Sequence, residues 1–568
     1  MDTHLPHPAL SRAALVRIVS TVSAGFVITQ LDVTIVNVAL ARIGIDLHTS
    51  VAGLQWIVDA YTLALAGLML SAGALGDRFG ARRLFAAGLA LFAVASFVCG
   101  IAANAATLIA ARALQGLAAA AMLPNSLALL NHACAHDPRL RARAVGWWTA
   151  SGAISIAAGP VIGGVLIAQF GWRSIFFVNL PLCAAGLAAT RLWIDSDDTR
   201  AAAASSASSA SSASSASSAS SASSASSASS ASSASSASSA SSASSASSAS
   251  SASSASSASS ASSASSASSA SSAADGAHHS HPAADRRASG PNACAPAPKR
   301  AAGAGTRGLD LPGQCLAVVA LTLFTGAVID WHPALVAIAL AAGAAFVFVE
   351  SRSAHPMMPL ALFRRRTFSV AVLFGVCMNL SYYGIIFVLS LYLQRVRHNT
   401  PLEAGLAFLP LTGGFLLSNV ASGWATAHYG PRRPMIAGAL IGATGFALLS
   451  AVRADTPIAM LVVPFLLIPG GMGLAVPAMT TTVLASVERA RAATASAVLN
   501  TARQAGGAIG VAAFGALASG ARPPDIVSGL HASAYVSAAL FVFASAMAAF
   551  VHGAPQPAAG KPANANAR

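Results

Sequence analysis

The sequence predicts an all-α integral membrane protein that crosses the bilayer fourteen times. Of its 568 residues, 55% are hydrophobic and only 9% are charged, and the mean hydropathy is +0.65. A single soluble core could not bury so much apolar surface, so the excess is expected to face lipid. Apolar runs of roughly 20 residues, the length that crosses the hydrocarbon of a bilayer, recur along the chain. They lie near residues 15–39, 51–73, 84–104, 106–130, 144–168, 174–194, 311–330, 333–350, 368–394, 402–427, 434–452, 457–485, 493–519 and 533–551.

The distribution of basic residues predicts the orientation of these spans. With the N-terminus inside, 25 of the 33 Lys and Arg residues fall on the inner side and 6 on the outer side. Because cytoplasmic loops carry an excess of Lys and Arg, both termini are expected in the cytoplasm. The net charge of +15 is then explained by topology, and nucleic-acid binding is not expected. The 6 cysteines are scattered without a CxxC pair, so they are expected to be small core residues.

A low-complexity insert and an internal repeat divide the chain. Residues 205–273 are uninterrupted SSA triplets, which lack large apolar side chains and predict disorder. The stretch GALGDRFGARR at 73–83 recurs in related form as GWATAHYGPRR at 423–433. This repeat predicts two six-helix bundles, spans 1–6 and 9–14, with spans 7 and 8 inserted, an arrangement found in transporters with a binding site between the halves. The expected divisions are an N-terminal bundle (1–194), a disordered cytoplasmic insert (195–308), two inserted spans with a cytoplasmic loop (309–366), a C-terminal bundle (367–552) and a cytoplasmic tail (553–568).

Charged residues inside spans are the first candidates for function. Asp32 interrupts span 1, where an isolated acid costs roughly 2.5–3.5 kcal/mol even on insertion scales. Burial favours the protonated form of a carboxyl group, so Asp32 could carry a proton, or it could bond neighbouring backbone. Arg112 lies too deep in span 4 to reach the surface easily, and Asp32 is its candidate partner, in a pair that either separates during transport or stays as a static salt bridge. Arg503 is another intramembrane charge, to which the sequence assigns no role.

Two further sets of residues have both a functional and a plain interpretation. Asp59, near the outer end of span 2, could favour cationic substrates in a cavity with aromatic walls, or it could simply contact water. The candidate aromatic walls are Tyr61, Trp147, Trp148, Tyr382 and Tyr383. In span 5, the small residues and proline of GPVIGG would let backbones approach closely and let the helix bend, or they would serve packing alone. These residues are Gly159, Pro160, Gly163 and Gly164.

The charged strip at 73–83 could act as a latch at the inner side. Its glycines allow a tight turn and a close approach of a neighbouring helix. Asp77 could contact the positive end of a partner helix or an arginine there. The alternative is that Arg78, Arg82 and Arg83 only anchor the topology.

These stretches resemble the motifs of the major facilitator superfamily. GALGDRFGARR resembles the loop between spans 2 and 3, and LDVTIVNVAL (31–40), RALQGLAAA (112–120) and GPVIGG (159–164) follow in the family's order. With fourteen spans, the combination resembles the branch of drug:proton antiporters. The resemblance implies the major facilitator fold, proton coupling by Asp32 and Arg112, and an antiporter motif at 159–164. It also implies a gating latch made of Gly73, Asp77, Arg78, Gly80 and Arg82.

The function implied is a proton-driven antiporter in a bacterial inner (plasma) membrane that exports amphipathic, including cationic, drugs or toxic compounds by alternating access. An exporter of one metabolite, amino acid or antibiotic, and a non-transporting sensor or scaffold, are the alternatives. No GxxxxGK[ST] loop, nucleophile elbow or metal-ligand spacing occurs, so neither an enzyme nor a cofactor beyond the proton motive force is expected. The expected partners are the small-molecule substrate, protons and lipid, with a periplasmic adaptor and an outer-membrane channel as candidates. The chain is expected to function as a monomer.

Overall fold

The computed structural model describes residues 12–134, 137–194, 310–330, 332–353, 358–488, 491–520 and 522–551. Within these ranges the secondary structure is entirely helical, without a strand. The insert expected at 195–308 and the tail expected at 553–568 lie outside the described residues. The expectations for those two segments therefore stay predictions.

The N-terminal half forms the six expected spans, and polar caps and a glycine turn set several of their ends. Ser50 and Asn104 accept hydrogen bonds from backbone amides in the first turns of the second and fourth helices. Gly80, with φ of 95°, makes the turn between the second and third helices, a conformation that favours glycine. The helices are α1 (Arg12–Asp46), α2 (Val51–Phe79), α3 (Ala81–Ile101), α4 (Ala105–Ala133), α5 (Pro138–Phe170), and the short α6 (Ser174–Phe177) that leads into α7 (Asn179–Trp193).

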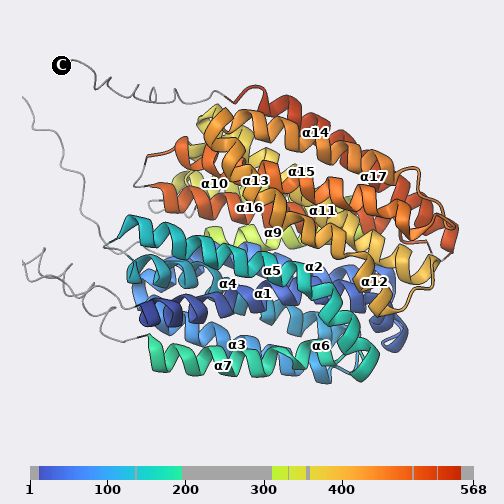
Figure 1. Cartoon of the computed structure of the whole chain (residues 1–568), viewed down its shortest axis with the longest axis horizontal. Coiled ribbons are helices and arrows are strands. Elements are labelled where there is room, and N and C mark those ends of the chain that lie inside the picture. Colours follow the sequence, from blue (N-terminus) through green and yellow to red (C-terminus); the bar gives the residue numbers. More distant parts are fainter. Residues whose placement is uncertain are drawn as a thin grey trace, which may run out of the picture. The chain divides into compact units, whose positions relative to one another are not determined.

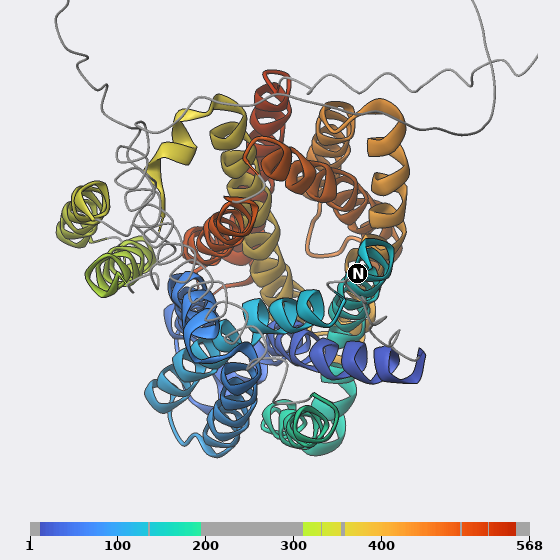
Figure 2. The same ribbon diagram turned by 90° about the vertical axis from the view of Figure 1, so that its left-hand side faces the viewer.

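The C-terminal half and the inserted pair complete the helical framework. The inserted helices are α9 (Leu311–Asp330) and α10 (Pro333–Arg352). The C-terminal half comprises α11 (Arg366–Leu391), α12 (Pro401–Ala407), α13 (Leu409–Tyr429), α14 (Arg432–Leu449), α15 (Ile458–Ala485), α16 (Ala492–Leu517) and α17 (Pro523–Ala548). Figure 1 shows the N-terminal helices, blue to teal, beside the C-terminal helices, yellow to red. Helix α9 packs against α2 and α16 and α10 packs against α9, so the green and yellow pair lies at the edge of the bundles (Figure 2).

Each of the fourteen expected spans coincides with a helix or a pair of helices, but not all of them have the character of a lipid-facing span. Among the described residues, 11 helices are long and apolar enough to cross a membrane, or up to 12 if the bent pair α12 and α13 is one span. Helices α14 and α16 fall short of that standard. Helix α14 is short and begins with two arginines, whereas α16 is rich in Ala, Gly and Thr and carries Arg503.

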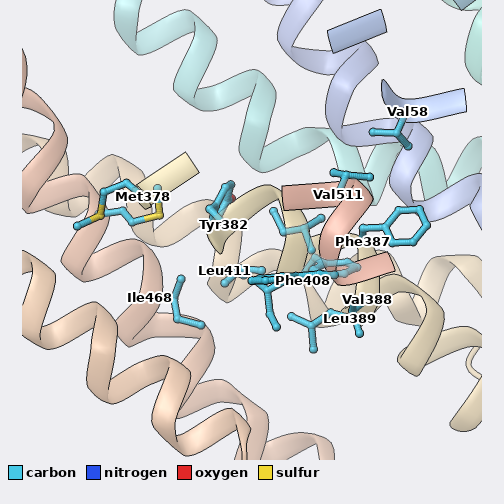
Figure 3. Packing of buried hydrophobic residues seen from close by; sticks show 14 of the residues in the cluster. Val58, Met378, Tyr382, Phe387, Val388, Leu389, Phe408, Leu411, Ile468 and Val511 are labelled. Carbon is cyan, nitrogen blue, oxygen red and sulfur yellow. The ribbon is translucent and has the colours of Figure 1, made fainter. Parts of the chain in front are cut away.

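The apolar core continues from one half into the other. One cluster of buried residues includes Val58 of α2, Phe387 of α11 and Val511 of α16 (Figure 3). A second cluster, with Phe85 and Phe92 of α3, belongs to the N-terminal half. The two halves are therefore joined by apolar packing as well as by the polar contacts described below.

Some glycines lie where two helices cross and leave no room for a larger side chain. A Cβ at Gly116 of α4 would lie 2.2 Å from the carbonyl oxygen of Tyr61 in α2. Backbone atoms cannot move aside cheaply, so Gly116→Val is expected to lower the free energy of unfolding by about 1–3 kcal/mol. The thermal unfolding midpoint of the purified protein in detergent measures the loss.

Gly343→Val in α10 is the matched control, because nothing lies within 4 Å of a Cβ at that position. An equal loss in both variants would show that valine in a helix, and not the contact between α2 and α4, causes the effect.

Candidate functional site

An ion pair is buried inside the N-terminal bundle. Arg112 Nη1 donates to Asp32 Oδ2, and the two side chains are only 1% and 0% exposed. The same nitrogen donates to Gln115 Oε1 at 2.8 Å, and Arg112 Nε donates to the carbonyl oxygen of Ile57 at 3.1 Å. The charge of each partner is thus compensated within the bundle, and neither faces lipid.

Neutral side chains from other helices complete this network around Asp32. Asn179 Nδ2 donates to Asp32 Oδ1 at 3.1 Å, and Gln115 Nε2 donates to the same oxygen at 3.3 Å. Gln115 Nε2 also donates to Ser96 Oγ at 2.8 Å, and the guanidinium carbon of Arg112 lies 4.4 Å from the centre of the Tyr61 ring. Helices α1, α2, α3, α4 and α7 therefore meet at one polar centre. Lone polar residues in apolar spans, such as Ser96 and Asn179, follow no pattern that would have identified them from the sequence.

A cavity of about 220 Å³ lies between the two halves. Its walls come from α1 and α5 on the N-terminal side and from α11, α13, α15 and α16 on the C-terminal side. Polar side chains point to it from both halves, among them Gln30, Thr34 and Asn37 of α1 and Asn379 and Arg503 of the other half. This mixture of a largely apolar wall with a few polar groups is typical of a small-molecule site.

The structure places the predicted substrate residues at different distances from this cavity. Tyr382 and Tyr383 line it. Trp148 stacks on Phe26, a lining residue, with 4.0 Å between ring centres, so it supports the wall from behind. Trp147 is 72% exposed and is not among the lining residues.

Asp59 also lies away from the cavity wall. Its side chain is fully buried in α2, and neither carboxylate oxygen has a hydrogen-bond partner among the described residues. Substrate contacts for Asp59 and Trp147 stay predictions.

The predicted latch lies at the turn between α2 and α3. Gly73 packs loosely near Pro124, and Gly80 makes the turn. Arg82 donates to the carbonyl oxygens of Thr190 at 3.4 Å and Arg191 at 3.3 Å, at the end of α7 where orphan carbonyl groups attract a cation. Arg82 thereby ties α3 to α7 within the N-terminal bundle.

Two other members of the predicted latch, Arg78 and Asp77, have no described contact with another helix. Arg78 is exposed, with its guanidinium carbon 5.5 Å from the centre of the Phe79 ring. The side chain of Asp77 lies outside the described ones. The latch role of this turn stays a prediction.

The small residues of α5 face two different helices. A Cβ at Gly159 would lie 2.0 Å from Thr34 Oγ1, and one at Gly163 would lie 2.6 Å from the Ile35 side chain, so both glycines pack against α1. Gly164 faces the other half instead. A Cβ there would lie 2.6 Å from Leu402 Cα, and the carbonyl oxygen of Pro160 lies 2.2 Å from the position of a Cβ on Gly405. Helix α5 therefore contacts α12 through backbone atoms.

Further contacts join the halves at the same level, near the end where α1 leads into α2. Gln55 Nε2 donates to the carbonyl oxygens of Val511 at 3.1 Å and Ala512 at 2.6 Å. Ser390 Oγ donates to the carbonyl oxygen of Asn37. We call these contacts, together with those of Gly164 and Gly405, the α1–α2 seam. The name refers to its place near the turn between α1 and α2, because the contacts themselves join the N-terminal half to the C-terminal half. The seam lies on the side of the cavity toward that turn, and its members Asn37 and Pro160 also line the cavity.

Within the described ranges, no group of three or more His, Cys, Asp or Glu side chains is placed to hold a metal ion. The polar groups described at the centre of the protein are the ion pair, the amides and hydroxyl groups around it, and those of the cavity lining.

Comparisons with known proteins agree on one family. The family model of the Major Facilitator Superfamily matches residues 22–219 and 293–511. The methylenomycin A resistance protein of Streptomyces coelicolor is 30% identical over 88% of this chain and 84% of its own length. The tetracenomycin C resistance and export protein of Streptomyces glaucescens is 29% identical over 87% of this chain and 74% of its own. Among solved structures, the xylose transporter XylE from E. coli matches with a TM-score of 0.55 and 12% identity, over 95% of this chain and 98% of that one.

Proposed function

The chain belongs to the Major Facilitator Superfamily, and we propose that it exports amphipathic drugs or other toxic compounds across the bacterial inner membrane in exchange for protons. The observation that carries this proposal is a cavity walled by both halves beside a buried ion pair of Asp32 and Arg112. The names of the similar proteins, which are resistance and export proteins, support the direction of transport. The cavity lies between two halves of the same chain, and we propose that the chain functions as a monomer.

The described conformation fits one state of an alternating-access cycle. If both termini are cytoplasmic, as the basic loops predict, the α1–α2 seam lies on the outer side of the membrane. The cavity would then be closed to the outside and would receive its substrate from the cytoplasm or the inner leaflet. Opening of this seam, with closure at the other end, would release the substrate outside.

Helix α1 is the physical connection between proton and substrate in this proposal. One of its faces holds Asp32 against Arg112, whereas Gln30, Thr34 and Asn37 line the cavity. Protonation of Asp32 would remove the negative charge that holds Arg112 and would loosen α1 from α4. A substrate that shifts α1 would change the same contact, so the two binding events are coupled through one helix. Each proton that moves inward across 100 mV supplies about 2.3 kcal/mol.

An exporter restricted to one compound class is the second candidate. The similar proteins from the two Streptomyces species are named for resistance to single compounds, methylenomycin A and tetracenomycin C. A panel of dyes and antimicrobials, tested for protection of a pump-deficient bacterium, separates broad from narrow export.

The energy source gives the direct test of the proposal. Cells that express the chain are expected to hold a fluorescent amphipathic dye at a lower level than control cells, and an uncoupler should remove that difference. For an uncharged dye, a potential of 100 mV alone supports a gradient of about 50-fold per inward proton, so the expected loss is large. Export that continues unchanged after collapse of the proton gradient would contradict proton exchange.

Deletion of residues 200–300 separates a transporter from a scaffold. A transporter without these residues should still export the dye, whereas a scaffold that depends on the insert should lose its function.

A further inference from the structure

Arg503 is a partly buried arginine that faces the cavity and has no acidic partner among the described residues. It lies on α16 and lines the cavity between the two halves. Its one side-chain hydrogen bond to a described residue runs from Nη2 to Asn379 Oδ1 at 3.5 Å, near the limit for such a bond. Its Nε is buried with no partner among the described residues, and none of the ion pairs in the described part of the chain includes it.

The contrast with Arg112 shows what Arg503 lacks. Both arginines lie inside spans, and Arg112 is satisfied by a carboxylate, an amide oxygen and a backbone carbonyl oxygen. A guanidinium group always carries its charge, and an uncompensated charge in a low-dielectric site is costly. Since the protein leaves Arg503 with one weak contact, the acceptor that it needs can come from a molecule in the cavity.

The rest of the cavity wall is neutral and partly aromatic. No Asp or Glu is among the lining residues, so Arg503 is the one charged group in that lining. Tyr382 packs edge-on against Tyr383 and Phe415, with ring centres 5.5 and 5.2 Å apart. Its hydroxyl group is also buried, with no hydrogen-bond partner among the described residues. Figure 3 shows Tyr382 among the buried residues of the apolar core cluster. Such a wall suits a flat apolar body with a polar end.

We infer that the substrates of this protein are amphipathic organic anions, in which a carboxylate binds Arg503 and an aromatic or alicyclic body packs against Tyr382, Tyr383 and Phe415. A carboxylate matches the two parallel N–H groups of a guanidinium, which fixes its orientation as well as its charge. This inference rests on the proposed export function and names its substrate class. It predicts anionic substrates, whereas Asp59 suggested cationic ones, because Arg503 lines the cavity and Asp59 does not.

The charge of the substrate changes how the membrane potential acts on transport. Export of one monoanion in exchange for one proton moves the equivalent of two positive charges inward. Export of one monocation for one proton moves none. The membrane potential acts only on net charge that moves, so anion export at this stoichiometry should be driven by the potential as well as by the pH difference.

Three probes with one apolar body and different charges test the inference by binding. They are 2-naphthylacetate, its neutral amide 2-naphthylacetamide, and the cation 2-(2-naphthyl)ethylamine, each titrated into the full-length protein in lipid nanodiscs. A charge-assisted, bidentate contact predicts that the acid binds about 10- to 100-fold more tightly than the amide, and that the amine binds most weakly. In Arg503→Gln the preference for the acid should disappear, and in Arg503→Lys it should persist in reduced form.

Arg491→Gln is the matched control, because Arg491 is exposed at the beginning of the same helix and away from the cavity. It should keep the full preference for the acid. The inference is overturned if the wild-type protein binds the amine as tightly as the acid, or if Arg503→Gln retains the preference. The wild-type comparison decides the matter even if a variant fails to fold.

Binding and transport failures can be told apart in proteoliposomes. Uptake of 2-naphthylacetate that is stimulated by a membrane potential alone, at equal pH on both sides, supports both the export function and an anionic substrate. Selective binding of the acid without any transport would contradict the proposed function and leave the anion site intact. Gradient-driven export of cations but not of the acid would contradict the anion site and leave the export function intact.

Discussion

Asp32→Asn is expected to abolish concentrative export and to lower the stability of the protein. The asparagine keeps the volume and part of the hydrogen bonding, but it removes the negative charge that compensates Arg112 inside the N-terminal bundle. Removal of one partner from a buried ion pair costs about 3–5 kcal/mol, because the remaining charge stays buried. Asparagine also cannot bind and release a proton. Dye efflux from the variant should therefore equal that of wild-type cells treated with an uncoupler, and its thermal unfolding midpoint in detergent should fall.

Two further variants separate the loss of coupling from the loss of stability. The double variant Asp32→Asn and Arg112→Gln removes both charges, so much of the lost stability should return while export stays absent. Asp59→Asn changes another buried acid, which has no charged partner among the described residues, and should affect stability far less. If Asp59→Asn uncouples transport and Asp32→Asn does not, the proton is carried by Asp59 and the assignment to Asp32 is wrong.

Gly164→Val is expected to block the transport cycle by opposing closure of the α1–α2 seam. A Cβ at this position would lie 2.6 Å from Leu402 Cα and 2.9 Å from the carbonyl oxygen of Pro401, both backbone atoms of the opposite half. Overpacking of this kind costs about 1–3 kcal/mol. Because only the closed seam has this clash, the conformational equilibrium should shift by roughly 5- to 150-fold toward the open seam.

Labelling of a cavity cysteine from outside the cell measures that shift. In a background without the native cysteines, Asn419→Cys places a thiol in the cavity wall. With Gly164→Val, a membrane-impermeant thiol reagent should label this cysteine faster, and dye efflux should fall. Gly146→Val on the same helix is the control, because nothing lies within 4 Å of a Cβ there. Equal labelling and equal efflux in the two variants would show that the seam does not close in the way described.

The sequence by itself was sufficient to determine the helical framework. Apolar runs of membrane length located the helices, because hydrophobicity over 20 residues is a local property of the chain. The helices α14 and α16 are the weakest examples, since arginines and small residues dilute their hydrophobicity. Asp32 and Arg112 were also recognisable, because a charge inside an apolar run is conspicuous without any knowledge of its neighbours.

Only the tertiary structure decided which of these residues act together. Arg112 and Arg503 look alike in the sequence, yet one has a carboxylate partner in the N-terminal bundle and the other has a cavity beside it. Trp147 and Tyr382 were equal candidates, and the structure exposes the first and places the second in the cavity wall. The physical reason is that a side chain's surroundings depend on how its helix is rotated against neighbours far away in the chain. That rotation is set by packing of whole helices, such as α5 on α1 and α12, and leaves no local pattern.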